Sequence, residues 1–104
     1  FDNLPDNERD ALSRMCDRIR TFATAQRSAI QDISIPIPGG KAGHRVQAVR
    51  TAGCYAPGGR YPLPSSVLMT AVTARVAGVS NVWVASPNPA QVRRSCCYNF
   101  LIHL

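Results

Sequence analysis

The sequence predicts an α/β fold: an N-terminal helix, then a short β hairpin or meander, then a βαβ unit. Three observations support this prediction. Apolar residues recur at nearly helical spacing between about residues 5 and 30, and they alternate between residues 33 and 55. The third observation is a strand–loop–helix–strand pattern over residues 52–85, which favours a parallel strand pair with a right-handed crossover.

The first helix is predicted over about Pro5–Ile30. Asn3 or Asp6 can cap its start, and Pro5 suits a first-turn position, where a missing N–H costs nothing. Because side chains three and four positions apart share one helix face, a surface helix should bury a single apolar stripe. The apolar residues at this spacing are Ala11, Met15, Ile19, Phe22 and Ala23.

The next segment has the alternation of short strands. In Ile33–Ile37 the branched residues fall on one face, and Pro38–Gly40 then turns the chain. The apolar alternation resumes at Val46 and Ala48 and continues to Tyr55. Since proline cannot donate to a β ladder, we expect the first of these strands at a sheet edge.

A loop rich in glycine and proline separates these strands from a second helix, and it spans about residues 53–64. Ser65 or Ser66 can cap the helix, which is predicted over residues 67–76. Gly78 stands where a left-handed residue would end that helix. The loop therefore lies between the end of a strand and the start of a helix.

The last predicted strand is Val82–Ala85, whose branched and aromatic residues are typical of a buried strand. Ser86–Pro89 ends it. With the preceding strand and helix, this run completes the βαβ unit.

The loop before the second helix is the candidate ligand site. In parallel βα units, ligands gather at the carboxyl ends of strands, and glycine lets the backbone approach a phosphate closely. Gly58 and Gly59 can supply that geometry, and the helix start near Ser66 can supply N–H donors and a positive dipole end. A tight connection would explain the same residues, so the loop alone leaves both interpretations open. The side chains that could contact a nucleotide here are Tyr55, Arg60 and Tyr61.

Composition argues against two other classes of protein. The formal net charge is +6, from 12 Lys+Arg against 6 Asp+Glu, an excess that nucleic-acid binding would use. Only Arg93 and Arg94 are adjacent, however, and no nucleic-acid-binding motif is present, so we expect no nucleic-acid partner. No apolar stretch approaches the ~18–20 residues of a membrane span, so we expect no membrane partner.

Cysteine usage and the N-terminus indicate the compartment. The cysteines, at positions 16, 54, 96 and 97, include no CxxC pair, and a disulfide framework would need denser spacing. Neither His44 nor His103 stands at metal-ligand spacing from a cysteine. Phe1–Leu4 lacks an initiator Met and the features of a signal peptide. We therefore expect an internal piece of a longer, cytoplasmic protein with reduced thiols.

Three consecutive stretches of the sequence resemble the histidinol dehydrogenase family closely and in order. They are Gly53–Gly59, Pro62–Ala71 and Ala74–Val79. The helix segment Arg18–Phe22 and the strand segment Val82–Pro87 also fit, so the resemblance covers about residues 10–90. Because the matching block is long, gapless and unusual in composition, the resemblance is specific.

The resemblance implies a zinc-containing, NAD-dependent oxidoreductase that converts an amino alcohol to the amino acid through an aldehyde, the last steps of histidine synthesis. It also implies a fold similar to that of the aldehyde dehydrogenases, and a homodimer. Tyr55 matches the family tyrosine that contacts NAD, and Gly58 and Gly59 match the turn that follows it. An aromatic ring packed beneath the loop is the alternative for Tyr55.

The chain departs from the family in what it lacks. The family's Glu–His acid/base pair and its zinc ligands, of Gln, His and Asp type, lie beyond this segment, so we expect neither catalytic nor metal-binding residues here. Residues 1–90 correspond to a partial NAD-binding α/β domain, whereas residues 91–104 do not resemble the family and form an aberrant tail. The chain alone is therefore expected to be inactive.

Three alternatives stay open. The chain could be a small non-catalytic nucleotide-binding βα module, or a piece of a related dehydrogenase that acts on another small alcohol. It could also be a relic without a stable fold, because a broken α/β domain leaves a sheet edge and apolar faces uncovered.

Overall fold

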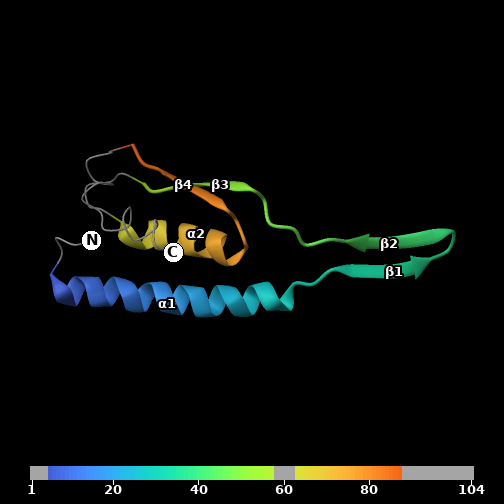
Figure 1. Ribbon diagram of the computed structural model, residues 1–104, viewed down its shortest axis with the longest axis horizontal. Helices are drawn as coiled ribbons and strands as arrows, with labels where there is room; N and C mark the ends of the chain where they lie inside the picture. Colours follow the sequence, from blue (N-terminus) through green and yellow to red (C-terminus); the bar gives the residue numbers. More distant parts are fainter. Residues whose placement is uncertain (1–4, 58–62, 88–104) are drawn as a thin grey trace.

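The computed structural model describes residues 5–57 and 63–87 (Figure 1). These residues form an α/β fold with an N-terminal helix, a hairpin and a βαβ unit, which confirms the predicted architecture at this level. The elements are α1 (Asp6–Ala29), β1 (Ile33–Ile37), β2 (Gly40–His44), β3 (Thr51–Tyr55), α2 (Pro64–Val76) and β4 (Asn81–Ala85).

Helix α1 starts without a side-chain cap. Pro5 is the N-cap residue, and its carbonyl oxygen accepts hydrogen bonds from the N–H groups of Glu8 and Arg9, each at 3.1 Å. The prediction that Asp6 caps the helix is wrong, because Asp6 is already the first helical residue; Asn3 lies outside the described residues. Asp6 and Glu8 instead place negative charge in the first turn, where the helix dipole favours it.

The buried face of α1 is rotated from the predicted stripe. The residues that face α2 are the buried Cys16 and Ala23 and the half-buried Leu12 and Ile19. Of the predicted stripe, Ile19 and Ala23 are on this face, whereas Phe22 is 66% exposed and Ala11 and Met15 are exposed as well. The reason is that α1 has apolar residues on more than one face, and packing against α2 selects the face that contains Cys16.

Strands β1 and β2 form an antiparallel hairpin whose register runs from Ile33 opposite His44 to Ile37 opposite Gly40. Pro38 and Gly39 make the two-residue turn, with Gly39 at a φ of +85°. The second strand therefore starts immediately after the turn. In the segment from 45 to 50 the predicted strand alternation is wrong, since this part of the chain is not in a strand.

The βαβ unit is formed by β3, α2 and β4, and its two strands pair in parallel as predicted. The register sets Thr51 opposite Asn81 and Tyr55 opposite Ala85. One hydrogen bond extends the ladder past the strand ends, from the N–H of Ala56 to the carbonyl oxygen of Ala85 at 2.8 Å.

The two ends of α2 are built differently. Leu63 is the N-cap, without a side-chain hydrogen bond, and Pro64 is the first helical residue, so the prediction that Ser65 or Ser66 caps the helix is wrong. Proline is well suited to that first position because its fixed φ matches the helix. At the other end, Gly78 has a φ of +89°, as predicted for a left-handed terminator.

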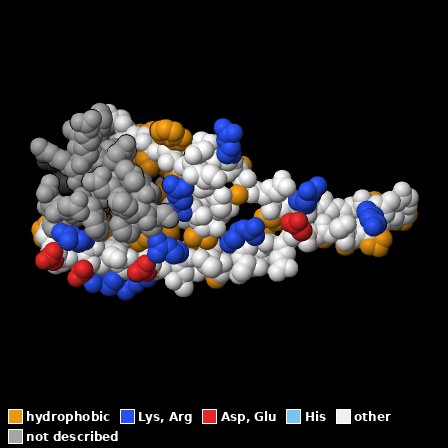
Figure 2. All heavy atoms as spheres, viewed as in Figure 1, with side chains coloured by type: hydrophobic (Ala, Val, Ile, Leu, Met, Phe, Trp, Pro, Cys, Tyr) orange, Lys and Arg blue, Asp and Glu red, His pale blue; other side chains and the backbone are white. Residues whose placement is uncertain are grey.

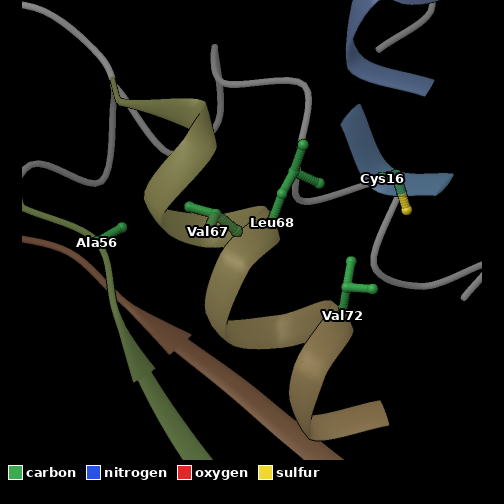
Figure 3. Close-up of a cluster of buried hydrophobic side chains, with 5 residues drawn as sticks. All are labelled: Cys16, Ala56, Val67, Leu68 and Val72. Atoms are coloured by element: carbon green, nitrogen blue, oxygen red, sulfur yellow. The ribbon is translucent and has the colours of Figure 1, made fainter. Parts of the chain in front are cut away.

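Helix α2 is the centre of the structure, with α1 on one side and the β3–β4 sheet on the other. Its side chains at Val67, Leu68, Ala71 and Val72 are buried. Val67 lies on the side of α2 nearer Ala56, and Val72 lies on the side nearer Cys16 (Figure 3). A helix buried on two sides needs apolar residues around most of its circumference, and α2 has them.

The β3–β4 sheet is covered on one face only by the described residues. Exposure alternates along β4, and Trp83 is 70% exposed, so the prediction of a buried strand is wrong. Val82 and Val84 point towards the α2 side and are half-buried, whereas Trp83 and its register partner Gly53 lie on the outer face. The branched and aromatic run identified the strand correctly but could not show that a covering layer was missing.

The molecule has a body, made of α1, α2, β3 and β4, and a projecting arm, defined here as the hairpin Ile33–His44 (Figure 1). Its extents are 61 × 26 × 22 Å, and its radius of gyration is 17.4 Å. A compact chain of this length would have a radius of gyration of about 13 Å. The arm makes the difference, because within residues 5–57 and 63–87 its two strands contact each other and no other helix or strand.

Candidate functional site

The candidate site lies at the carboxyl ends of β3 and β4. Tyr55 and Ala85 are the last residues of these parallel strands and are register partners, so both strands end at the same edge. In open α/β sheets, this edge is where ligands bind. The structure thus places Tyr55, the one predicted site residue among the described residues, at this edge of the sheet.

The side chain of Tyr55 is 62% exposed. A ring packed beneath the loop, the alternative considered from the sequence, does not agree with this exposure. By contrast, its neighbours Cys54 and Ala56 are each only 6% exposed, because they point towards α2. The strand therefore presents the phenol outward and holds it between two anchored residues.

The rest of the predicted loop lies outside the described residues. This applies to Gly58 and Gly59, which were predicted to approach the cofactor, and to Arg60 and Tyr61. Their role stays a prediction.

The start of α2 offers fewer hydrogen-bond donors than the sequence suggests. Pro64 has no N–H, and the N–H of Ser66 donates to the carbonyl oxygen of Leu63 at 3.2 Å. An anion at a helix start is held by N–H groups that have no partner within the helix. Of the groups that the sequence offered for phosphate binding, the described first turn therefore supplies only part.

Trp83 is a second aromatic residue near the site. From the sequence it had been predicted to lie in the core. It lies opposite Gly53, two residues before Tyr55 on the neighbouring strand, so both aromatic side chains belong to the outer face of the sheet. Glycine at the paired position means that no side chain lies directly opposite the indole on β3. That pairing could be recognised only after the strand register was known.

Neither of the two buried thiols among the described residues is placed to react. Cys16 is fully buried in the core cluster and Cys54 lies on the covered face of β3; both are free. Burial raises the pKa of the Cys16 thiol, an effect that the nearby Arg20 guanidinium opposes and the Asp17 carboxylate reinforces. Arg20 donates to Cys16 Sγ at 3.5 Å and to Asp17 Oδ1 at 3.0 Å. A buried thiol with a raised pKa is a poor nucleophile.

Metal-binding residues do not gather within residues 5–57 and 63–87. No three His, Cys, Asp or Glu side chains in these ranges lie close enough to share an ion. The imidazole of His44 instead lies 3.0 Å, at Nε2, from the carbonyl oxygen of Gln31, and His103 is outside the described residues. Zinc, which the family resemblance implies, has no fitting donor set in this part of the chain.

An open hollow of about 480 Å³ lies at the base of the arm, away from Tyr55. Its lining residues are Asp32, Ile33, Ser34, Gly43, His44 and Arg45. Asp32 is engaged in fixing the local backbone, since its Oδ1 accepts a hydrogen bond from the N–H of Val46 at 2.8 Å.

Among the described helices, none is long and apolar enough to cross a membrane.

Comparison with known proteins gives a consistent result. A family model described as histidinol dehydrogenase matches residues 1–101. A histidinol dehydrogenase homolog of Mesorhizobium japonicum is 44% identical over 84% of this chain and 18% of that protein. A histidinol dehydrogenase of Parasynechococcus marenigrum is 48% identical over 81% of this chain and 19% of that protein.

A third relative carries a different name. The sulfopropanediol 3-dehydrogenase of Ruegeria pomeroyi is 40% identical over 68% of this chain and 17% of that protein. In all three comparisons, the chain spans less than a fifth of the curated relative that it matches.

Proposed function

The chain belongs to the histidinol dehydrogenase family, and on that premise we propose that it is part of an oxidoreductase that uses NAD and zinc. The proposed reaction is oxidation of an amino alcohol to the amino acid through the aldehyde, in the last steps of histidine synthesis. The intact protein would have a fold similar to that of the aldehyde dehydrogenases and act as a cytoplasmic homodimer. Because the chain spans only a fraction of its relatives, these are properties of the whole protein.

The exposed phenol of Tyr55, at the carboxyl end of a parallel strand, is the observation that carries the NAD proposal. An aromatic ring there can stack on the cofactor, and the following turn at Gly58 and Gly59 would let the backbone approach its phosphates. This chain would supply one wall of the NAD site.

The reaction chemistry would come from elsewhere in the intact protein. When bound, zinc would polarise the alcohol oxygen, and an acid/base pair would move protons. The described residues offer no donor set for that zinc. We therefore assign cofactor positioning to residues 1–90, assign no catalytic role to residues 91–104, and expect no turnover from the chain alone.

The NAD contact is tested by binding to the chain itself. Titration with NAD, followed by calorimetry or ligand-detected NMR, should give weak saturable binding. Tyr55→Ala should weaken that binding roughly tenfold, because the stacking surface is lost. Tyr55→Phe is the matched control, since it keeps the ring and should bind nearly as well as the native chain. Equal binding by all three chains would contradict the assignment of Tyr55.

Turnover separates the segment from a complete enzyme. Histidinol, NAD and zinc should yield no NADH with this chain alone, because general acid/base groups and metal must act together. Clear NADH production would contradict the proposal that the catalytic groups lie elsewhere in the intact protein. Saturable NAD binding without turnover would also be given by a small nucleotide-binding module. That alternative is favoured only if the longer protein is inactive as well.

A second substrate class has specific support. One relative is named for a sulfopropanediol rather than for histidinol, although it matches the same segment. The residues of this segment therefore accompany more than one small-alcohol substrate in the family. Steady-state assays of the longer protein with histidinol and with sulfopropanediol, compared by kcat/KM, would decide which alcohol is oxidised.

A further inference from the structure

We propose that a brace at the base of the arm holds it at a fixed angle to helix α1, so that arm and body move as one rigid unit. The brace is defined here as the side chains of Arg27, Asp32 and His44 together with the backbone groups that they bind. The inference concerns the conformation of the arm and does not depend on the proposed cofactor site.

Contacts between its strands and the body do not set the direction of the arm. Among the described residues, its two strands contact each other and no other helix or strand. The arm projects beyond the body, and charged side chains of both signs are visible where the two join (Figure 2). Its direction must therefore be set by the two segments that join it to the body, residues 30–32 on the outgoing side and residues 45–50 on the returning side.

The outgoing segment is tied to the end of α1. Ile30 follows the last residue of the helix, and its N–H donates to the carbonyl oxygen of Arg27 at 3.3 Å. The guanidinium of Arg27 binds the same residue, since its Nη1 donates to the carbonyl oxygen of Ile30 at 3.1 Å. Both polar backbone groups of Ile30 are thus bonded to one residue of the helix, which fixes the direction in which the chain leaves α1.

Two side-chain hydrogen bonds join the outgoing segment to the returning one, beyond the last ladder pair, Ile33 opposite His44. The imidazole Nε2 of His44 lies 3.0 Å from the carbonyl oxygen of Gln31, and it is the donor because a carbonyl oxygen can only accept. Asp32 Oδ1 accepts a hydrogen bond from the N–H of Val46 at 2.8 Å. These bonds join residues 13 and 14 positions apart, so side chains continue the pairing past the end of the backbone ladder.

The returning segment is anchored at a different place on the body. The methyl group of Ala48 lies beside Gly78 at the end of α2, since a Cβ built on Gly78 would come within 3.2 Å of the Cβ of Ala48. The carbonyl oxygen of Arg50 accepts a hydrogen bond from the N–H of Asn81, at the start of β4, at 3.0 Å. The arm therefore has two supports, one at α1 and one at the turn between α2 and β4, with cross-links between them.

The brace is effective because its bonds follow one another along the chain. Each bond is exposed to solvent, and a single exposed hydrogen bond contributes little because water competes for both partners. Residues 30, 31 and 32 each carry one of them, however, so rotation of the arm about this segment breaks at least one bond. Loss of one cross-link should therefore loosen the base of the arm while the core and the strands stay folded.

NMR spectroscopy of the 104-residue chain tests the proposal. In the native chain the backbone order parameters of residues 30–32 and 45–47 should be about 0.85, as for rigid backbone, and they should fall below about 0.6 in Asp32→Ala and in His44→Ala. Residual dipolar couplings of the arm and of α1 should fit a single alignment tensor in the native chain. They should need two tensors in these variants, because the arm would then turn independently of the helix.

Two further variants are matched controls. Asp32→Asn keeps an Oδ1 acceptor for the N–H of Val46 and should behave like the native chain. Ser28→Ala removes a side-chain hydrogen bond at the same end of α1, from Ser28 Oγ to the carbonyl oxygen of Ala25 at 2.8 Å, and should leave the arm rigid because this bond lies outside the brace. Far-UV circular dichroism and the amide shifts of α2 check that each variant is folded.

The native chain alone can overturn the proposal, whatever the variants do. Low order parameters at the base of the arm, or separate alignment tensors for the arm and α1, would show that the arm is not held. The proposal would also fail if Asp32→Ala and His44→Ala left the arm aligned with α1. A similar loosening in Ser28→Ala or in Asp32→Asn would count against it too, because the effect would then not come from the bonds of the brace.

Discussion

Among single residues, Leu68 should contribute most to the stability of the fold. It is a large side chain, 1% exposed, in the cluster that joins α2 to α1 and the sheet. Leu68→Ala should lower the free energy of unfolding by about 2–5 kcal/mol, through lost burial and the cavity left behind. Urea denaturation followed by circular dichroism measures the change. The adjacent Met69 is 59% exposed, so Met69→Ala should cost far less. Similar losses in the two variants would show that the cluster is not the core.

Because of Cys16, the free energy of unfolding should vary with pH in the alkaline range. Burial raises the pKa of its thiol above that of an unfolded cysteine, although the nearby Arg20 guanidinium opposes the shift. The folded chain thus holds this proton more tightly than the unfolded chain, and the resulting stability is fully present below the unfolded pKa of about 8.5. It is lost as pH rises through the higher pKa of the folded state.

The measurement compares the native chain with Cys16→Ala, by urea denaturation between about pH 7 and pH 10.5. The difference in unfolding free energy should be constant near neutral pH and shrink above about pH 8.5, because only the native chain must ionise a buried thiol. Other groups that titrate in this range are common to both chains and cancel. A difference that stays constant over the whole range would contradict the prediction.

Helix α2 ends, at the scale of elements, in a hydrogen-bonded motif centred on Gly78. The N–H of Gly78 donates to the carbonyl oxygen of Arg75 at 2.9 Å, and that of Val79 donates to Ala74 at 3.1 Å. This is the Schellman arrangement, which needs a left-handed residue after the helix. The Arg75 guanidinium adds a hydrogen bond to the carbonyl oxygen of Ser80 at 2.6 Å. The turn into β4 is therefore closed by both backbone and side chain.

Gly78→Ala should destabilise the fold by about 1–2 kcal/mol, because an L-residue is disfavoured at positive φ. A Cβ there would also approach the Cβ of Ala48 to 3.2 Å. Gly53→Ala is the matched control, since a Cβ at that position meets nothing within 4 Å. The thermal midpoint of Gly78→Ala should fall while that of Gly53→Ala holds or rises slightly. Equal midpoints would mean that the left-handed turn is not required.

The sequence predicted which elements form better than where each one packs. The period of α1, the Pro38–Gly39 turn and the Gly78 terminator are local signals, and the structure confirms them. Which face of α1 is buried depends on contact with α2, and local spacing cannot choose between Cys16 and Phe22. The helix starts were predicted wrongly for a local reason: Pro5 and Pro64 stand at the two starts, where side-chain caps had been expected.

At the scale of the whole molecule, the sequence could predict the location of the candidate site, because the order of strands and helix determines it. It could not predict which side chains are exposed there. A parallel βαβ unit places the end of β3 beside the end of β4, so the location of Tyr55 followed from the sequence. The exposure of Trp83 did not follow, because it depends on a layer that the described residues lack. Parallel sheets are usually covered on both faces, and that general rule made the buried strand a reasonable but incorrect expectation.

The open outer face of the sheet leads to a whole-molecule prediction that a single fluorophore can test. Trp83 is the only tryptophan of the chain and is 70% exposed. Its emission should resemble that of a free indole in water, and acrylamide should quench it nearly as well as it quenches a tryptophan amide. Trp83→Phe should change the unfolding free energy by no more than about 0.5 kcal/mol, as for a surface position.

Blue-shifted emission that acrylamide cannot quench would show that other residues of the chain cover the outer face of the sheet, and would contradict the exposed position of Trp83. A fall in the unfolding free energy of Trp83→Phe well beyond about 0.5 kcal/mol would lead to the same conclusion, because only a packed side chain costs so much to replace.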